Sequence, residues 1–159
     1  MELIAKSDVG KKRLNNEDSY YIKMLPNDGG LFIVADGLGG YSGGEIASDM
    51  LTKNVSEYIE SKSRWLKNAT DEKIKFVLKE SINFANENIY NLASSSSDYQ
   101  GMGTTVTLVY KIDNRIFYLS VGDSRLYYLD KNLKHMEQIT VDDTYVNAVS
   151  YTHLRAHET

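Results

Sequence analysis

The chain has 159 residues and a formal net charge of −4, from 18 Lys and Arg against 22 Asp and Glu. This length suits one domain, and the lack of a broad cationic field argues against nucleic acid or an anionic membrane surface as a partner. Because the sequence has no cysteine, a bound metal ion would have oxygen or imidazole ligands, as Mg²⁺ or Mn²⁺ prefer. No run approaches the ~20 apolar residues of a membrane span, and the N-terminus lacks a signal-peptide core. We therefore expect a cytoplasmic protein.

The first apolar segments are short. The runs Glu2–Ala5 and Ser19–Leu25 are followed by Gly30–Ala35, which is partly β-branched and flanked by glycines. Such short runs are typical of strands, and the third is typical of a buried one. We expect three N-terminal strands.

Two longer segments have helical periodicity. Ser42 and Glu45 form a capping box before the first, and Thr70 precedes the second, whose first turn contains Asp71 and Glu72. Each segment places its apolar residues on one face, at Ile46, Ala47, Met50, Leu51, Val55, Tyr58 and Ile59 and at Ile74, Val77, Leu78, Ile82, Ala85, Ile89 and Leu92. We expect two amphipathic helices, the second ending at the polar run 94–98.

After residue 103 the period changes to two. Thr104–Ile112, Arg115–Val121 and Arg125–Leu129 alternate in polarity and are separated by short turn segments. This pattern predicts consecutive hairpin strands. Strands, two helices and further strands predict an α+β layered domain.

The last ten residues, 150–159, do not fit this pattern. They resemble the translated read-through of a sequencing adapter, so we assign the domain to residues 1–149 and interpret 150–159 as a non-native tail. The tail contains His153 and His157, whose spacing of four would suit a metal pair on a helix. We interpret this spacing as accidental, because no partner motif accompanies it.

The segment from Ala35 to Gly40, Ala-Asp-Gly-Leu-Gly-Gly, lies between the third predicted strand and the first predicted helix. A carboxylate at the end of a strand, here Asp36, is held by the sheet yet exposed, and Gly37 lets a backbone carbonyl turn toward the same ion. The segment therefore suits a hard cation. It would equally suit a glycine-rich turn with a capping Asp. The spacing is not that of the dinucleotide-binding G-x-G-x-x-G motif.

Two further polar segments border predicted strands. Glu17 and Asp18 would add negative charge near Asp36, and Arg13 offers a planar guanidinium suited to a phosphate monoester. Read alone, this segment is a solvated turn. Asp123, in Val-Gly-Asp-Ser-Arg, would ordinarily belong to a turn, but its carboxylate could also face a metal ion. Covalent catalysis is disfavoured, because there is no cysteine and no Gly-x-Ser-x-Gly motif.

Five segments, taken in order, resemble the type 2C, or PPM, family of metal-dependent serine/threonine protein phosphatases, particularly the bacterial ones. They cover residues 7–18, 32–40, 101–105, 121–125 and 138–142. The resemblance implies a four-layer α-β-β-α sandwich of two antiparallel sheets flanked by helices, incomplete at the C-terminus. It also implies two or three Mn²⁺ or Mg²⁺ ions and a metal-activated water that hydrolyses phosphoserine or phosphothreonine in proteins.

The resemblance also assigns roles to residues. Asp36 would bridge two ions, the Gly37 carbonyl would bind one of them, and Glu17 and Asp18 would be direct or water-mediated ligands. Arg13 would bind the substrate phosphate, and Asp123 matches a carboxylate associated with a third ion. Leu38 and Asp143 stand where many relatives have histidines, so that Leu38 cannot act as a general acid.

The later Ser-Asp-Gly-Leu and final Asp-Asn motifs of the family do not follow Asp142. We therefore expect a truncated chain that is itself inactive, from a monomeric parent that dephosphorylates proteins and opposes a cognate kinase. The alternative is a non-catalytic, phosphatase-like sensor or binding module.

Overall fold

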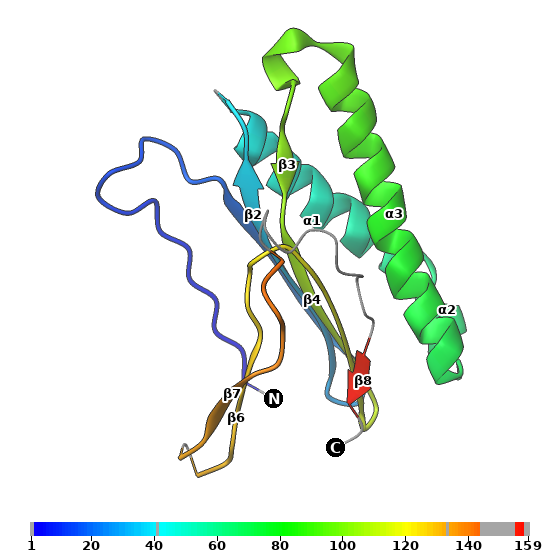
Figure 1. Cartoon of the computed structure of the whole chain (residues 1–159). Coiled ribbons are helices and arrows are strands. Elements are labelled where there is room, and N and C mark those ends of the chain that lie inside the picture. The colour runs from blue at the N-terminus through cyan, green and yellow to red at the C-terminus, as the bar shows by residue number, and fades with distance from the viewer. Residues whose placement is uncertain (1, 41, 133, 144–154, 158–159) are drawn as a thin grey trace.

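The computed structural model describes residues 2–40, 42–132, 134–143 and 155–157. Two antiparallel sheets and a set of helices make up this part of the chain (Figure 1). The strands are β1 (Asp18–Leu25), β2 (Gly29–Leu38), β3 (Gly103–Thr104), β4 (Val106–Ile112), β5 (Arg115–Val121), β6 (Tyr127–Leu129), β7 (Met136–Gln138) and β8 (Arg155–His157). The helices are α1 (Gly43–Ser61), α2 (Ser63–Leu66) and α3 (Asp71–Ser95), with the 3₁₀ turn η1 (Ser97–Tyr99).

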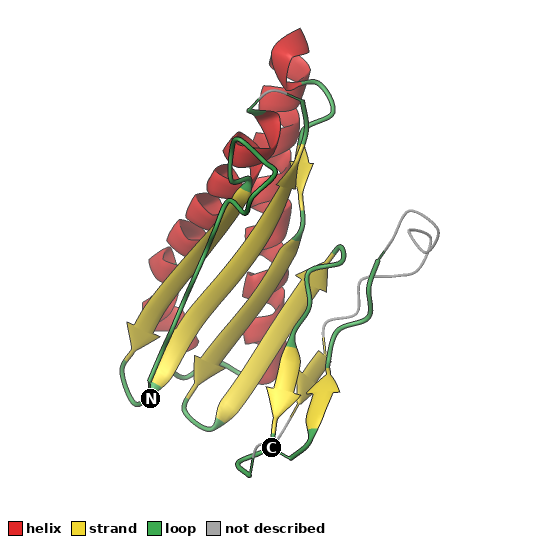
Figure 2. Cartoon of the chain, turned by 90° about the vertical axis from the view of Figure 1, so that its left-hand side faces the viewer, coloured by secondary structure: helices red, strands yellow, loops and turns green. Residues whose placement is uncertain are grey.

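The larger sheet has the order β1-β2-β4-β5-β8, with β3 pairing to β2, and the smaller sheet pairs β6 with β7. Helices α1 and α3 pack side by side on one face of the larger sheet (Figure 2). The α+β fold with two antiparallel sheets is thus confirmed. No helix of the described residues is long and apolar enough to cross a bilayer.

The alternation of β2 decides which face of the sheet is buried. Leu31, Ile33 and Ala35 are almost fully buried against the helices, whereas Val34 and Asp36, between and after them, are exposed. The core is completed by the apolar stripes of both helices and by β4 and β5, with Leu51, Val55, Ile74, Leu78, Leu108 and Phe117 among its members. Each large apolar side chain buried there contributes about 1.5–3 kcal/mol.

The helix boundaries follow the predicted start signals, with one difference. Thr70 caps α3 through its side chain, whose oxygen accepts a hydrogen bond from the Lys73 backbone N–H at 3.4 Å. Ser42 is the N-cap residue of α1 but makes no such bond. The start of α1 was therefore predicted from the right residue, but the capping-box hydrogen bond was wrong.

Two strand predictions were also wrong. Glu2–Ala5 forms no strand, because Ile4 is 87% exposed, Leu3 is only half-buried, and the segment pairs with no neighbouring strand among the described residues. The segment after β5 does not form a hairpin with it, since β6 pairs with β7 instead. Gly122, with φ of +100°, begins the change of direction between the two sheets. The short α2 and η1 were not anticipated.

The tail interpretation stays a prediction. Residues 155–157 form β8, which pairs antiparallel with β5 through Phe117 and its neighbours. His157 therefore lies in a strand, and His153 lies outside the described residues. A strand does not provide the helical face that a metal pair with this spacing would need.

Candidate functional site

Asp18 and Asp36 lie directly opposite each other where β1 begins and β2 nears its end. Both residues are exposed, and directly opposed residues of an antiparallel pair share one face of the sheet. Partial burial and then the negative charge of Asp18 raise the pKa of Asp36, and Asp123 raises it further. Arg13 acts in the opposite direction and lowers the pKa of Asp36. The three aspartates and Arg13 therefore form one electrostatic group.

Glu17 is adjacent to Asp18 but lies against the beginning of α1. Its carboxylate packs so closely on Gly44 that a Cβ there would come within 2.8 Å of the Glu17 Oε1 atom. Arg13 Nη1 is 3.6 Å from Glu17 Oε2, and the Glu17 carbonyl accepts a hydrogen bond from the Gly37 N–H at 3.0 Å. Glu17 thus links the Arg13 segment to the N-terminus of α1. The positive end of the helix dipole there stabilises the Glu17 carboxylate.

Gly37 is also required for a steric reason, apart from the predicted role of its carbonyl. Its backbone is not in the left-handed region, but a Cβ at this position would lie 2.0 Å from the Gly44 carbonyl oxygen. Only glycine lets β2 approach the first turn of α1 this closely. The close approach places Asp36 beside the helix N-terminus.

Thr105 connects the Asp36 and Asp123 segments, a role that sequence reasoning missed. Its hydroxyl oxygen accepts a hydrogen bond from the Asp36 N–H at 3.0 Å, and its backbone N–H donates to the Asp36 carbonyl at 2.9 Å. The same hydroxyl lies 2.7 Å from the Ser124 hydroxyl. The Thr-Thr pair at the start of a strand was the available signal, but its partners are distant in the sequence.

The Asp123 segment is also held from the other side. The Arg125 guanidinium contacts both carboxylate oxygens of Asp142, with Nε at 2.9 and 3.0 Å, and the Asp143 N–H donates to the Gly122 carbonyl at 2.9 Å. The hydrogen bond from Arg125 is the main cause that lowers the pKa of Asp142. The segment 138–142, which contains Asp142, therefore positions the loop that contains Asp123.

The donor set of this site suits a hard cation only in part. Asp18 and Asp36 present carboxylate oxygens on one face, the ligand type that Mg²⁺ and Mn²⁺ prefer, and a cation would relieve their repulsion. Within residues 2–40, 42–132, 134–143 and 155–157, no three Asp, Glu, His or Cys side chains lie close enough together to hold a metal ion. Asp123 thus acts on Asp36 electrostatically, and Glu17 faces α1. The described residues therefore bring two candidate carboxylate ligands together, without a third.

Comparisons with known proteins identify the same family that the sequence motifs resemble. A family model described as "Protein phosphatase 2C" matches residues 10–158. Protein phosphatase PhpP of Streptococcus pneumoniae is 32% identical over 151 residues, which cover 92% of this chain and 57% of PhpP. The chain thus spans little more than half the length of this relative.

Solved structures show the same similarity. The serine/threonine phosphatase PstP/Ppp of Mycobacterium tuberculosis matches with a TM-score of 0.74 at 32% identity, over 91% of this chain and 55% of that one. The catalytic domain of PstP in complex with two manganese ions matches with a TM-score of 0.73 at 31% identity, over 91% and 56%.

Proposed function

The chain belongs to the protein phosphatase 2C family, and from this membership we propose that the protein hydrolyses phosphoserine and phosphothreonine in other proteins with the help of Mn²⁺ or Mg²⁺. The observation that carries the proposal is the opposed pair Asp18 and Asp36, with Arg13 and Asp123 in electrostatic contact. Two negative charges held face to face on a sheet destabilise the fold unless they bind a cation.

Asp36 and Asp18 would hold the metal ions, with the Gly37 carbonyl, Glu17 and Asp123 as further direct or water-mediated ligands. Such ions, when bound in pairs, activate water for attack at phosphorus and neutralise the developing charge. PstP, whose catalytic domain was solved with two manganese ions, supports Mn²⁺ as the kind of ion. Glu17 would act through water or after a side-chain movement, since its carboxylate faces Gly44.

Arg13 would bind the substrate phosphate. Its side chain is 66% exposed, and among the described residues its one ion pair is a long contact to Glu17, so several of its N–H donors are available. Guanidinium groups bind phosphate oxygens through paired hydrogen bonds. Its effect on the pKa of Asp36 supports a position beside the carboxylates.

We expect the remaining ligands to come from residues outside this chain. The chain spans 57% of PhpP, and the described residues bring no three metal-binding side chains together. Fewer carboxylates bind a second hard cation less tightly. The 159-residue chain alone should therefore be inactive, and the activity belongs to the full-length protein.

The experiment measures phosphate release from a phosphothreonine peptide by the full-length protein, with and without Mn²⁺. The wild type should turn over only with metal, Asp36→Asn should lose turnover, and Asp49→Asn should retain it, because Asp49 is an exposed carboxylate of α1 outside the site. Metal-independent turnover, or full activity of Asp36→Asn, would contradict the proposal.

The alternative of a non-catalytic sensor or binding module is not favoured, because the relatives and the solved neighbours are protein phosphatases. A sensor would bind Mn²⁺ or a phosphopeptide in calorimetry without releasing phosphate. The partners of the phosphatase would be phosphorylated proteins, a cognate serine/threonine kinase among them. We place the protein in the cytoplasm and expect a monomer, which light scattering would test.

A further inference from the structure

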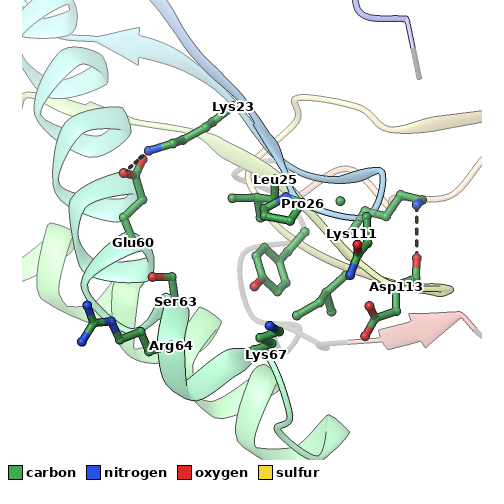
Figure 3. A pocket seen from close by; sticks show the side chains of 13 residues that line it. Lys23, Leu25, Pro26, Glu60, Ser63, Arg64, Lys67, Lys111 and Asp113 are labelled. Atoms are coloured by element: carbon green, nitrogen blue, oxygen red, sulfur yellow. Dashed lines mark hydrogen bonds and ion pairs between the residues drawn. The ribbon is translucent and has the colours of Figure 1, made fainter.

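A cavity of about 450 Å³ lies at the opposite end of the β1–β2 hairpin from Asp36 (Figure 3). Its lining comes from the β1–β2 turn, the end of α1, α2 and the β4–β5 turn. Seven register steps separate the Asp18–Asp36 pair from the Leu25–Gly29 pair, which corresponds to about 23 Å along the strands. The cavity is therefore separate from the candidate metal site.

The floor of the cavity is apolar. Leu25, Pro26, Ile112 and the ring of Tyr110 contribute to its lining. Volumes of about 300–1,000 Å³ with apolar linings and a few polar groups are typical of small-molecule sites. The floor would therefore accept the apolar body of a small ligand.

Three side chains of the cavity lining are available as hydrogen-bond donors. Tyr110 is only 2% exposed, yet its hydroxyl makes no hydrogen bond among the described residues. Lys67 and Arg64, both exposed, have no ion pair within the part of the chain that the structure describes. Figure 3 shows the Lys67 ammonium turned toward the cavity and the Arg64 guanidinium at its outer rim.

The acidic side chains of the lining are already engaged. Glu60 accepts hydrogen bonds from Tyr21 and Lys23, and the Asp113 carboxylate lies 3.9 Å from the Arg115 guanidinium. The remaining cation, Lys111, donates to the carbonyls of two turn residues at 2.7 and 3.1 Å. Positive charge and unused donors thus remain, and they favour an anionic group on the ligand.

We propose that this cavity is a binding site for a small organic carboxylate with an apolar body. The body packs on Leu25, Pro26 and Ile112, and the carboxylate accepts hydrogen bonds from Lys67 and from the Tyr110 hydroxyl, with Arg64 adding charge at the rim. This inference is independent of the proposed catalysis, because none of these groups belongs to the metal site.

The test is calorimetric titration of the full-length protein with 2-naphthoate and with 2-naphthalenemethanol, its neutral analogue of similar shape. The wild type should bind the carboxylate about tenfold more tightly than the alcohol, since a hydrogen bond to a charged group contributes more than a neutral one. Equal affinities, or no binding of either compound, would overturn the proposal.

Three variants locate the bound carboxylate. Lys67→Ala should weaken 2-naphthoate about tenfold and leave the alcohol unchanged, and Tyr110→Phe should weaken it about fivefold. Lys53→Ala is the matched control, because it removes another exposed lysine, on α1 and outside the cavity. Equal effects of the two lysine substitutions would overturn the site, as would displacement of 2-naphthoate by a phosphothreonine peptide, which would place it at Arg13.

Discussion

Replacing Asp36 with Asn should stabilise the metal-free protein while removing its activity. Directly opposed residues of an antiparallel pair have Cβ atoms about 5 Å apart, and Asp36 faces Asp18 in this way. Two unit charges at about 5 Å in water repel by about 0.8 kcal/mol. Asp123 adds to the repulsion and Arg13 offsets part of it. Because both aspartates are exposed and screened, we expect a net gain of about 0.5–1 kcal/mol in unfolding free energy.

The assay is urea unfolding of wild type and Asp36→Asn in EDTA, repeated at several pH values. The pKa of Asp36 is raised in the folded state, so the folded wild type binds more protons than the unfolded chain. The loss of unfolding free energy that the Asp36 charge causes in the wild type is therefore absent below the unfolded pKa of about 3.9 and complete above the folded pKa. The advantage of the variant should appear over this interval as the pH rises and stay constant at neutral pH.

Mn²⁺ should reverse the order of stability. A ligand that binds only the folded state stabilises it in proportion to its binding, and the wild type retains the carboxylate that the ion needs. Asp49→Asn, the control on α1, should change neither the EDTA value nor the gain with Mn²⁺. A variant less stable than wild type in EDTA would refute the electrostatic argument, because it would mean that the Asp36 carboxylate stabilises the fold without metal.

The remaining predictions concern the groups around Asp36. Thr105→Val keeps the side-chain shape but removes the acceptor of the Asp36 N–H. It should lower the unfolding free energy by about 1–3 kcal/mol in urea titrations and reduce turnover of the full-length protein. Gly37→Ala places a Cβ 2.0 Å from the Gly44 carbonyl oxygen, which should cost about 3 kcal/mol by the same measurement. Asp142→Asn should lower stability at neutral pH. Arg125 holds the pKa of Asp142 below its usual value, so this difference should disappear as the pH falls through the folded pKa, and thermal unfolding at several pH values would show it.

Much of the sheet could be predicted because its strands alternate. β4 and β5 were anticipated from period-two patterns, and their pairing from Val106 opposite Val121 to Ile112 opposite Arg115 follows from the short turn between them. The segment 2–5 lacked such a pattern and formed no strand. The partner of β6 could not be predicted, because three exposed residues contain no information on which strand they pair with.

The sequence predicted which residues belong to the candidate site better than it predicted how they are arranged. Asp18 and Asp36 come together as expected, but Glu17 faces the opposite side. The pleat of a strand separates neighbouring side chains, and the expectation that Glu17 and Asp18 would both lie near Asp36 did not take this into account. The link through Thr105 could not be predicted, because the Ser124 hydroxyl is 19 residues away and is brought close only by the tertiary fold.

The pattern that builds the core also exposes the carboxylate. Leu31, Ile33 and Ala35 face the helices with at most 1% of their surface exposed, so the pleat places Asp36 on the open face. The Gly37–Gly44 contact and the Thr105 hydrogen bonds then prevent the end of β2 from turning Asp36 away from Asp18. The repulsion of less than about 1 kcal/mol is small beside the burial of even one of these apolar side chains, which contributes about 1.5–3 kcal/mol. The core therefore stabilises an arrangement of charges that only a bound cation would make favourable locally, so the proposed metal site would already be formed before an ion binds.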